Sequence, residues 1–266
     1  MRLLACSDPH CGHVGGLAPP GWTVSEKAYP GWPAARRETW NRWRGILKAY
    51  GPFDAGLFLG DGIDGRGEKD WGADCTLPDQ IKQAECLAEC LAAVPFRGGR
   101  PRWAAVFGTD YHTGRCEQFE GLAYDAIGIP AALRGNTVQV RAGPVLFDLR
   151  HDIGGSSTPT GGDIALRKEA LTTQEWHRQH GGEIPTVILR GHVHYCRHVE
   201  DAAGWHVWTL PSLQLWTRFG SKRVHGRVIH WGALIIDIDK GGHISWLPVT
   251  VPLHSFQPAG PLPRLI

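Results

Sequence analysis

The chain has 266 residues, of which 42% are hydrophobic and 20% are charged, and this composition excludes an intrinsically disordered protein. A formal net charge of +2 is too small to predict nucleic-acid binding from charge alone. No apolar run reaches transmembrane length, and the apolar stretch at residues 1–4 is too short for a signal peptide, so we expect a cytoplasmic protein.

The first half of the chain alternates predicted strands with predicted helices. Short apolar runs followed by turn residues predict buried strands, and apolar residues at helical spacing predict amphipathic helices. Strands are predicted at residues 3–6, 53–59 and 103–107, and helices at residues 34–50 and 78–94. A loop rich in Gly, Pro and Trp covers about residues 13–33.

The second half is richer in short β-runs. Strands are predicted at residues 138–141, 145–150, 186–189, 197–200, 205–210, 227–239 and 243–251, and one helix near residues 163–180. The first two of these strands are expected to pair across a Gly-Pro turn. There is no internal repeat and no linker, so we expect a single domain over residues 1–266. Its βα units come first and its mainly antiparallel strands come later.

The cysteine pattern argues against a disulfide framework. The seven cysteines are odd in number and form no CxxC pair, so no Cys-type zinc site follows from their spacing. Cys86 and Cys90, four residues apart in a helical pattern, are predicted to share a buried face as small apolar residues. A reducing, cytoplasmic setting fits this cysteine usage best.

Acids and histidines recur where the predicted strands end. The set comprises Asp8, His10, Asp61, Asp64, His112, His151, His192 and His194. In open α/β sheets, ligands bind at the carboxyl ends of strands. One intervening residue, as between Asp8 and His10, places two side chains on the same side of an extended segment. Carboxylate and imidazole ligands together suit Zn, Mn or Fe. One aspartate can bridge two such ions, and a two-ion site supports in-line displacement at phosphorus.

The order of these motifs resembles that of the calcineurin-like metallophosphoesterases. The shared order is Asp-x-His, Gly-Asp-x-x-Asp, a third motif that starts with Gly and contains His, a single His, and Gly-His-x-His. The resemblance runs from Asp8 to His194 and, through the β-rich tail, over the whole chain. It implies an α/β fold, a four-layer α/β/β/α sandwich of two mixed sheets flanked by helices. The implied activity is the hydrolysis of phosphate esters.

The resemblance also implies a role for each residue of the set. Asp8, His10 and His194 would bind the first metal, Asp61 would bridge both metals, and His151 and His192 would bind the second. Asp64 would accept a hydrogen bond that orients a histidine. Arg66 lies where some relatives clamp phosphate, although a solvated loop arginine is an equal alternative. The two divalent ions would be Mn, Zn or Fe, with Mn favoured.

The third motif departs from the family pattern. The family has Gly-Asn-His followed by an acid, whereas this chain has Gly108-Thr109-Asp110-Tyr111-His112. The segment resembles a Gly-Thr-x-x-His variant of phage-type members, so the amide ligand is lost or replaced. His112 is the candidate catalytic residue, as general acid or as a ligand of the second metal. Asp110 is a competing ligand.

Three functions are compatible with this pattern. The first is a phosphodiesterase or nuclease acting on nucleic acid or nucleotides. It is favoured by the basic run at residues 218–223 with Arg227, by the aromatic-rich loop and by the likeness to phage-type members. The second is a phosphomonoesterase acting on small molecules or phosphoproteins. The third is a metal-binding scaffold without turnover, which only the altered third motif supports. A solvated face is the simpler explanation of the basic run, and core packing that of Trp40 and Trp43.

Overall fold

The computed structural model describes residues 1–22, 32–65, 80–113, 118–154, 161–201, 204–215 and 229–251. The first sheet contains β1 (Arg2–Cys6), β2 (Ala55–Phe58), β3 (Trp103–Val106), β4 (Arg134–Gly135), β10 (Trp231–Ile238) and β11 (Ile244–Val251). The second sheet contains β5 (Thr137–Ala142), β6 (Val145–Arg150), β7 (Val187–Arg190), β8 (Arg197–Glu200) and β9 (His206–Thr209). The helices are α1 (Trp32–Tyr50), α2 (Gln80–Ala92), α3 (Asp110–Thr113), α4 (Gln118–Ala126) and α5 (Gly161–His180), with short 3-10 turns η1 (Pro20–Trp22) and η4 (Ala131–Leu133).

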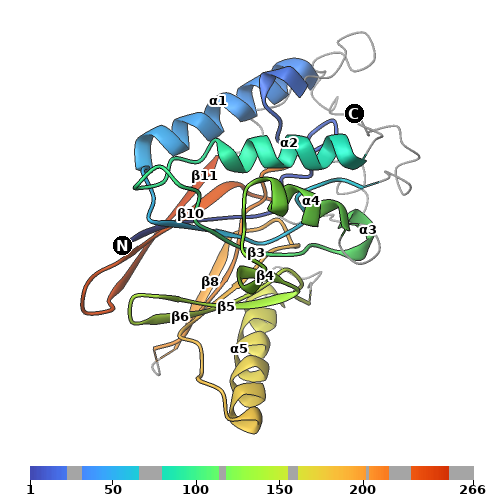
Figure 1. The fold of residues 1–266 in the computed structure, drawn as a ribbon. Helices are drawn as coiled ribbons and strands as arrows, with labels where there is room; N and C mark the ends of the chain where they lie inside the picture. The colour runs from blue at the N-terminus through green and yellow to red at the C-terminus, as the bar shows by residue number, and fades with distance from the viewer. Residues whose placement is uncertain are drawn as a thin grey trace, which may run out of the picture.

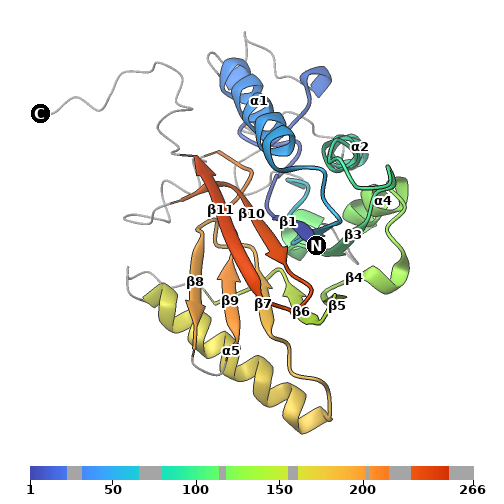
Figure 2. The same cartoon turned by 90° about the vertical axis from the view of Figure 1, so that its left-hand side faces the viewer.

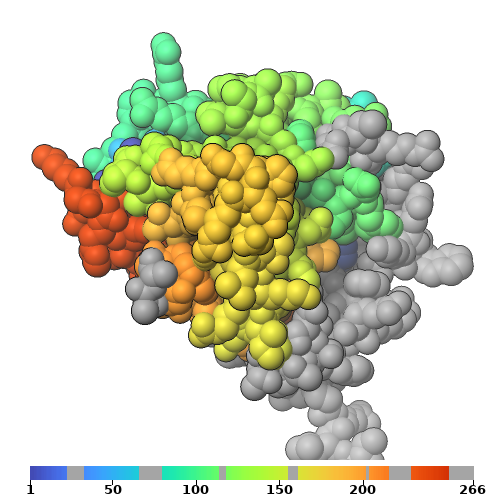
Figure 3. All heavy atoms as spheres, turned by 90° about the horizontal axis from the view of Figure 1, so that it is seen from below, coloured from blue at the N-terminus to red at the C-terminus, as the bar shows by residue number. Residues whose placement is uncertain are grey.

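The elements form four layers, as predicted. The first sheet has the order β11-β10-β1-β2-β3-β4 and the second the order β5-β6-β7-β9-β8. Helices α1, α2 and α4 cover the outer face of the first sheet, and α5 covers the outer face of the second (Figure 1). From below, α5 lies across the middle of the molecule (Figure 3). The architecture is therefore an α/β/β/α sandwich of two mixed sheets.

The strand directions of the second half are mainly antiparallel, with a parallel pairing at the centre of the second sheet. The hairpins β5–β6 and β8–β9 are antiparallel, but β6–β7 and β7–β9 are parallel pairs at the centre of the second sheet. The chain crosses from β6 to β7 through α5, and a helical crossover returns the chain in the same direction. Figure 2 shows α5 running beneath β8 and β9. Because β10 also pairs antiparallel with β11 and with β1, the second half is mainly antiparallel, as predicted, apart from the centre of its own sheet.

Strand β1 shows why the predicted strands are apolar throughout rather than alternating. Leu4 and Cys6 pack into the core under the helices, whereas Leu3 and Ala5 pack into the core between the two sheets. All four residues are fully buried. A strand covered on both faces reads as a continuous apolar run. Fully burying one leucine contributes about 2 kcal/mol, so β1 is a strong anchor for the loop that follows it.

Helix α1 follows its predicted amphipathic pattern. Trp40, Trp43 and Leu47 are buried against the first sheet, which confirms core packing for the two tryptophans. The helix begins at Trp32, so Pro33 lies in its first turn, where its missing N–H costs nothing. The predicted loop before it contains η1, and its residues 23–31 lie outside the described part of the chain.

Helix α4 was not predicted from the sequence. It is nine residues long and has Gly121 near its centre, so its local helix propensity is weak. It forms because Ala123 and Tyr124 are buried in the core under the helices, where α4 contacts α2. The short elements α3 and β4 were not predicted either, and the boundaries of the predicted elements lie within a few residues of their prediction. None of the described helices combines the length and apolarity that a membrane crossing requires.

Candidate metal centre

The strand ends bring the predicted acids and histidines together. Three groups of possible ligand atoms form there, and within each group all the atoms lie within 4.8 Å of one another. The groups are Asp8 with His10 and His194, His10 with Asp61 and His112, and Asp61 with His151 and His192. The groups overlap because His10 and Asp61 each belong to two of them. The result is one continuous array of donors rather than separate sites.

The backbone that aims these side chains is left-handed. Positive φ angles occur at Asp8 (54°), His10 (43°), Asp61 (47°), His192 (69°) and His194 (56°). This corrects the expectation of extended segments with both side chains on one side. A non-glycine residue at positive φ is uncommon and costs free energy, so five in one region mark a constrained site. The turns send His192 and His194 to different donor groups, which an extended segment could not do.

Close backbone contacts explain two of the glycines in the motifs. A Cβ on Gly108 would lie 2.2 Å from Asp61 Oδ1, and one on Gly191 would lie 2.4 Å from Ser7 Oγ. No side chain is tolerated at such distances without displacement of the neighbouring backbone or polar group. The glycines therefore allow the loops after β2, β3 and β7 to approach closely enough to form the array.

His151 and Asp61 form the buried floor of one group. His151 Nε2 lies 3.0 Å from Asp61 Oδ2, and both residues are 2% exposed. The Nδ1 atom of His151 bonds to the carbonyl oxygen of Leu59. Because a carbonyl can only accept, Nδ1 carries the proton and Nε2 is left with its lone pair. This is the tautomer that a metal-binding histidine needs.

Asp8 is held by polar groups from its own loop and from the loop after β7. Ser7 Oγ donates to Asp8 Oδ2, and the backbone N–H of His192 donates to the same oxygen at 3.2 Å. His194 Nε2 lies 3.1 Å from Asp8 Oδ1. The side chain of Asp8 is fully buried, whereas those of His192 and His194 reach the surface. The array thus has a buried carboxylate floor and a histidine rim.

The third motif contacts the array through Thr109 and His112. The backbone N–H and the hydroxyl of Thr109 lie 2.7 Å and 3.1 Å from Asp61 Oδ1 and donate to it. His112 Nδ1 donates to the carbonyl oxygen of Asp64 at 2.7 Å. The rings of His112 and His10 are 4.6 Å apart. His112 therefore has a defined tautomer, with Nε2 left for a proton or an ion. Asp110, the competing candidate, is exposed and joins no donor group among the described residues.

Glu120 on α4 is a buried residue that sequence reasoning missed. Its carboxylate accepts the backbone N–H groups of Gly62 at 2.5 Å and Gly108 at 2.8 Å, so it joins the second motif to the third. Burial raises its pKa to about 7, although both N–H donors oppose the rise. A lone glutamate in a weakly helical segment offers no sequence signal for this contact.

The electrostatics of the array favour positive charge. Burial opposes ionisation of Asp61, but the neighbouring His151 and His112 outweigh it and hold the pKa of Asp61 far below its ordinary value. Burial likewise opposes protonation of His10, but Asp64, Asp8 and Asp61 raise its pKa to about 10. The pKa of His151 also rises to about 10, because the charge of Asp61 outweighs burial. The same potential that attracts protons attracts divalent cations.

The donor atoms fit a metal centre. Both ring nitrogens of His10 and Nε2 of His151 are buried and have no hydrogen-bond partner in the described structure. A buried polar atom without a partner costs about 1–3 kcal/mol, and a coordinated ion removes that cost. Mixed carboxylate and imidazole donors suit first-row divalent ions. The residues at hand therefore fit two adjacent metal ions.

The remaining predicted residues divide into two cases. Asp64 is buried, and its Oδ1 lies 3.6 Å from His10 Nδ1 and 4.0 Å from His112 Nδ1. An orienting role for Asp64 stays a prediction that this placement allows. Arg66 and the basic run at residues 218–223 with Arg227 lie outside the described residues.

No family model and no curated protein sequence matches this chain. Among solved structures, the chain is similar to wild-type Vps29 of Entamoeba histolytica in complex with Zn²⁺. The two chains are 13% identical, the match covers 94% of this chain and 99% of that one, and the TM-score is 0.44. It is also similar to an archaeal phosphodiesterase, with 11% identity, coverage of 94% and 100%, and a TM-score of 0.46. A phosphoesterase of E. coli, Yfce, has 15% identity, coverage of 93% and 99%, and a TM-score of 0.43. The strand order and the layers of this chain by themselves define its α/β/β/α sandwich.

Proposed function

We propose that this protein hydrolyses phosphate esters with two divalent metal ions at the strand-end array, as a calcineurin-like metallophosphoesterase. The observation that carries the proposal is the position of Asp61. It belongs to one donor group with His151 and His192 and to another with His10 and His112. A carboxylate shared by two adjacent groups is what a pair of ions needs.

The donors divide between two ions as follows. Asp8, His10 and His194 would hold the first ion, and His151 and His192 the second, with Asp61 between them. Two ions so placed lower the pKa of a bound water and stabilise the attacking and leaving oxygens of an in-line displacement at phosphorus. The histidine rim faces solvent, so a phosphate group can approach from that side.

The chain itself supplies the positioning. Thr109 fixes the orientation of the Asp61 carboxylate through two hydrogen bonds to Oδ1. His112 stands beside His10, where it can protonate the leaving oxygen from Nε2; as a ligand it would join His10 and Asp61, and binding of the second ion stays a sequence-based prediction. Burial lowers the pKa of His112, although the charge of Asp61 opposes this. A histidine with a lowered pKa gives up its proton more readily once it is protonated.

For the substrate we propose phosphodiesters, with nucleic acid or nucleotides as the class. The support is in the sequence, in the basic run after the last histidine motif and in the aromatic-rich loop before α1. Base stacking on aromatic side chains and attraction of phosphate by basic ones are the usual means of binding single-stranded nucleic acid. For the ion we propose Mn²⁺, because Mg²⁺ prefers oxygen donors and this array is rich in imidazole.

A turnover panel tests the proposal. Chelator-treated protein is loaded separately with Mn²⁺, Zn²⁺ and Mg²⁺ and assayed on nitrophenyl phosphate mono- and diesters, cyclic nucleotides and single-stranded DNA. We expect diester hydrolysis that is highest with Mn²⁺. Asp61→Asn should abolish this activity. Asp110→Asn is its matched control, because Asp110 is an exposed acid that joins no donor group among the described residues. Preference for monoesters would make the protein a phosphomonoesterase, and two bound ions without turnover would make it a scaffold.

A further inference from the structure

A second cluster of ligand-type side chains lies under the helices, away from the carboxylates. It consists of Cys11, in the loop after β1, with Cys86 and Cys90 from one face of α2. All three are buried, and their sulfur atoms lie within 4.8 Å of one another. The Sγ atoms of Cys11 and Cys90 are 3.9 Å apart. The sequence predicted the pairing of Cys86 with Cys90 on one helix face, but the fold adds Cys11.

We propose that Cys11, Cys86 and Cys90 form a separate metal site for a thiophilic divalent cation, with Zn²⁺ as the expected occupant. Zinc binds thiolate sulfur at about 2.3 Å in a tetrahedron, which places neighbouring sulfurs about 3.8 Å apart. The 3.9 Å between Cys11 and Cys90 matches that separation. The carbonyl oxygen of Leu17 lies 3.9 Å from Cys90 Sγ, so an oxygen donor is at hand for the fourth position.

The charge of Arg36 selects a divalent ion. Arg36 is 1% exposed, and the three cysteines act electrostatically on its guanidinium. With a divalent ion bound, three thiolates would carry a charge of −3, the ion +2 and Arg36 +1, so the assembly would be neutral. A monovalent ion would leave a net negative charge in the core. Uncompensated charge is costly there, which favours the neutral combination.

Simple apolar packing does not account for this arrangement. Buried thiols alone can fill a core as small apolar groups. Here the buried side chain of Arg36 on α1 interacts electrostatically with all three cysteines, so charge as well as apolar packing shapes the cluster. The thiolate is the form that binds metals.

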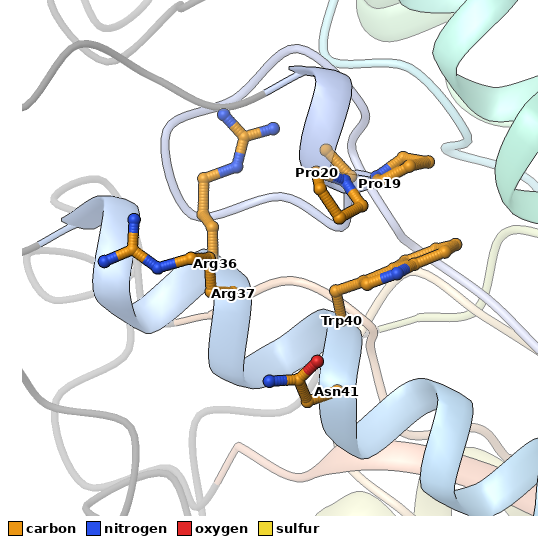
Figure 4. A pocket seen from close by; sticks show the side chains of 7 residues that line it. Pro19, Pro20, Arg36, Arg37, Trp40 and Asn41 are labelled. Atoms are coloured by element: carbon orange, nitrogen blue, oxygen red, sulfur yellow. The ribbon is translucent and has the colours of Figure 1, made fainter.

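The cluster lies close to a hollow in the surface. Arg36 also lines a cavity of about 120 Å³, together with Ala18, Pro19, Pro20, Arg37, Trp40 and Asn41. Figure 4 shows Trp40 of α1 beside Pro19 and Pro20, with Arg36, Arg37 and Asn41 on the same helix. Arg36 therefore both lines this cavity and interacts electrostatically with the cysteines.

The proposed site would stabilise the loop that connects the cysteine cluster to the Asp/His array. The backbone N–H of Cys11 donates to Gly62 O at 2.8 Å, and Cys11 O accepts the N–H of Asp64 at 3.0 Å. An ion that joins Cys11 to α2 would fix the loop that carries His10. The inference rests on sulfur geometry alone and does not depend on the proposed hydrolysis.

Cobalt substitution tests the site in the full-length protein. Metal-free, fully reduced protein is titrated with Co²⁺, and sulfur-to-cobalt charge-transfer absorption is recorded in the near ultraviolet. The Asp/His array contains no sulfur, so it cannot produce this absorption. We expect the band in the wild type, its displacement by Zn²⁺, and at least a severalfold loss in Cys86→Ser and Cys90→Ser. Cys6→Ser is the matched control, because Cys6 is equally buried but lies outside the cluster.

A second measurement covers variants that fail to fold. Zinc X-ray absorption of the wild type should show a sulfur shell at about 2.3 Å. Absence of both the cobalt band and the sulfur shell in reduced protein would overturn the proposal. A band of undiminished strength in Cys86→Ser and Cys90→Ser would overturn it as well.

Discussion

The Asp/His array and the cysteine cluster gather metal-ligand side chains in opposite ways. In the array, five of the donors lie on left-handed backbone at the ends of strands from both sheets. In the cluster, two of the three sulfurs come from successive turns of the regular helix α2. The array combines carboxylates with imidazoles, whereas the cluster combines small thiols with one guanidinium.

The difference shows what each chemistry demands of the fold. Carboxylates and imidazoles are too polar to be buried without partners, so the chain accepts unfavourable φ angles to place them. Thiols can be buried as apolar groups, so a helix can carry them without distortion. A polar centre therefore leaves marks in the sequence, such as Gly-Asp and Gly-His pairs, and a thiol cluster leaves few.

The largest effect on turnover is expected from Asp61→Asn. Two adjacent dications need the negative charge of the residue between them, and a neutral amide supplies none. We expect turnover to fall to background and bound metal to drop below two ions per chain, with the fold retained. Metal analysis and circular dichroism check this. Near-normal turnover with two bound ions would contradict the shared-carboxylate interpretation.

His112→Ala separates the two roles open to that residue. A general acid contributes about 100- to 10,000-fold, and only when the leaving oxygen needs a proton. If His112 is the acid, the variant keeps both ions and loses most activity on poor leaving groups, but much less on a nitrophenyl ester. If His112 is a ligand of the second ion, the variant loses that ion, and the rate of hydrolysis falls equally for all substrates. Two retained ions with undiminished activity on every ester would exclude both roles.

Glu120→Gln should lower metal affinity although Glu120 is not itself one of the proposed metal ligands. A glutamine can accept only one of the N–H groups of Gly62 and Gly108, because its second terminal atom is itself a donor. Loosening the loops that carry metal ligands typically costs about 10- to 100-fold in metal affinity or activity. Asp125→Asn, at an exposed position of the same helix, is the control. Equal metal affinity in both variants would argue against a positioning role for Glu120.

Glu120 should also give stability a pH dependence. Its pKa is about 7 in the folded protein against 4.5 ordinarily, so between these values the folded state holds a proton that the unfolded chain has released. Its contribution to the free energy of unfolding is therefore fully present below pH 4.5 and is lost as pH rises towards 7. Between pH 4.5 and 7, the difference in free energy of unfolding between the wild type and Glu120→Gln should therefore decrease by up to about 3 kcal/mol. Urea unfolding of both metal-free proteins at several pH values measures it, and a constant difference would refute it.

The smallest effect on turnover is expected from Cys86→Ser. Its side chain contacts neither the carboxylates nor the histidine rim, so turnover with saturating Mn²⁺ should stay within a few-fold of wild type. Its thermal stability in Zn²⁺ should fall, because an ion at 100 times its dissociation constant adds about 2.7 kcal/mol to a site that binds only the folded state. Melting curves with and without Zn²⁺ test this. An equal zinc response in both proteins would place the stabilising ion elsewhere.

The sequence predicted more of the array than of its supports. Motif spacing identified Asp61 and His151, because a strand that runs into an acid or a histidine can be seen locally. Thr109 was noted only as part of a departing motif, and its contact with Asp61 came from the structure. Glu120 was missed entirely, because α4 forms through burial of Tyr124 rather than through local propensity.

By itself, the sequence determined the strand–helix order, the apolar character of the buried strands and the polar residues at their ends. These follow from local patterns of burial, which repeat every two residues in half-buried strands and every 3.6 in helices. Only the tertiary structure decided the parallel centre of the second sheet, the division of His192 and His194 between two donor groups, and the meeting of Cys11 with Cys86 and Cys90. These features depend on which loops pack against one another. Contacts between residues far apart in the chain are set by the packing of whole layers, which local spacing does not encode.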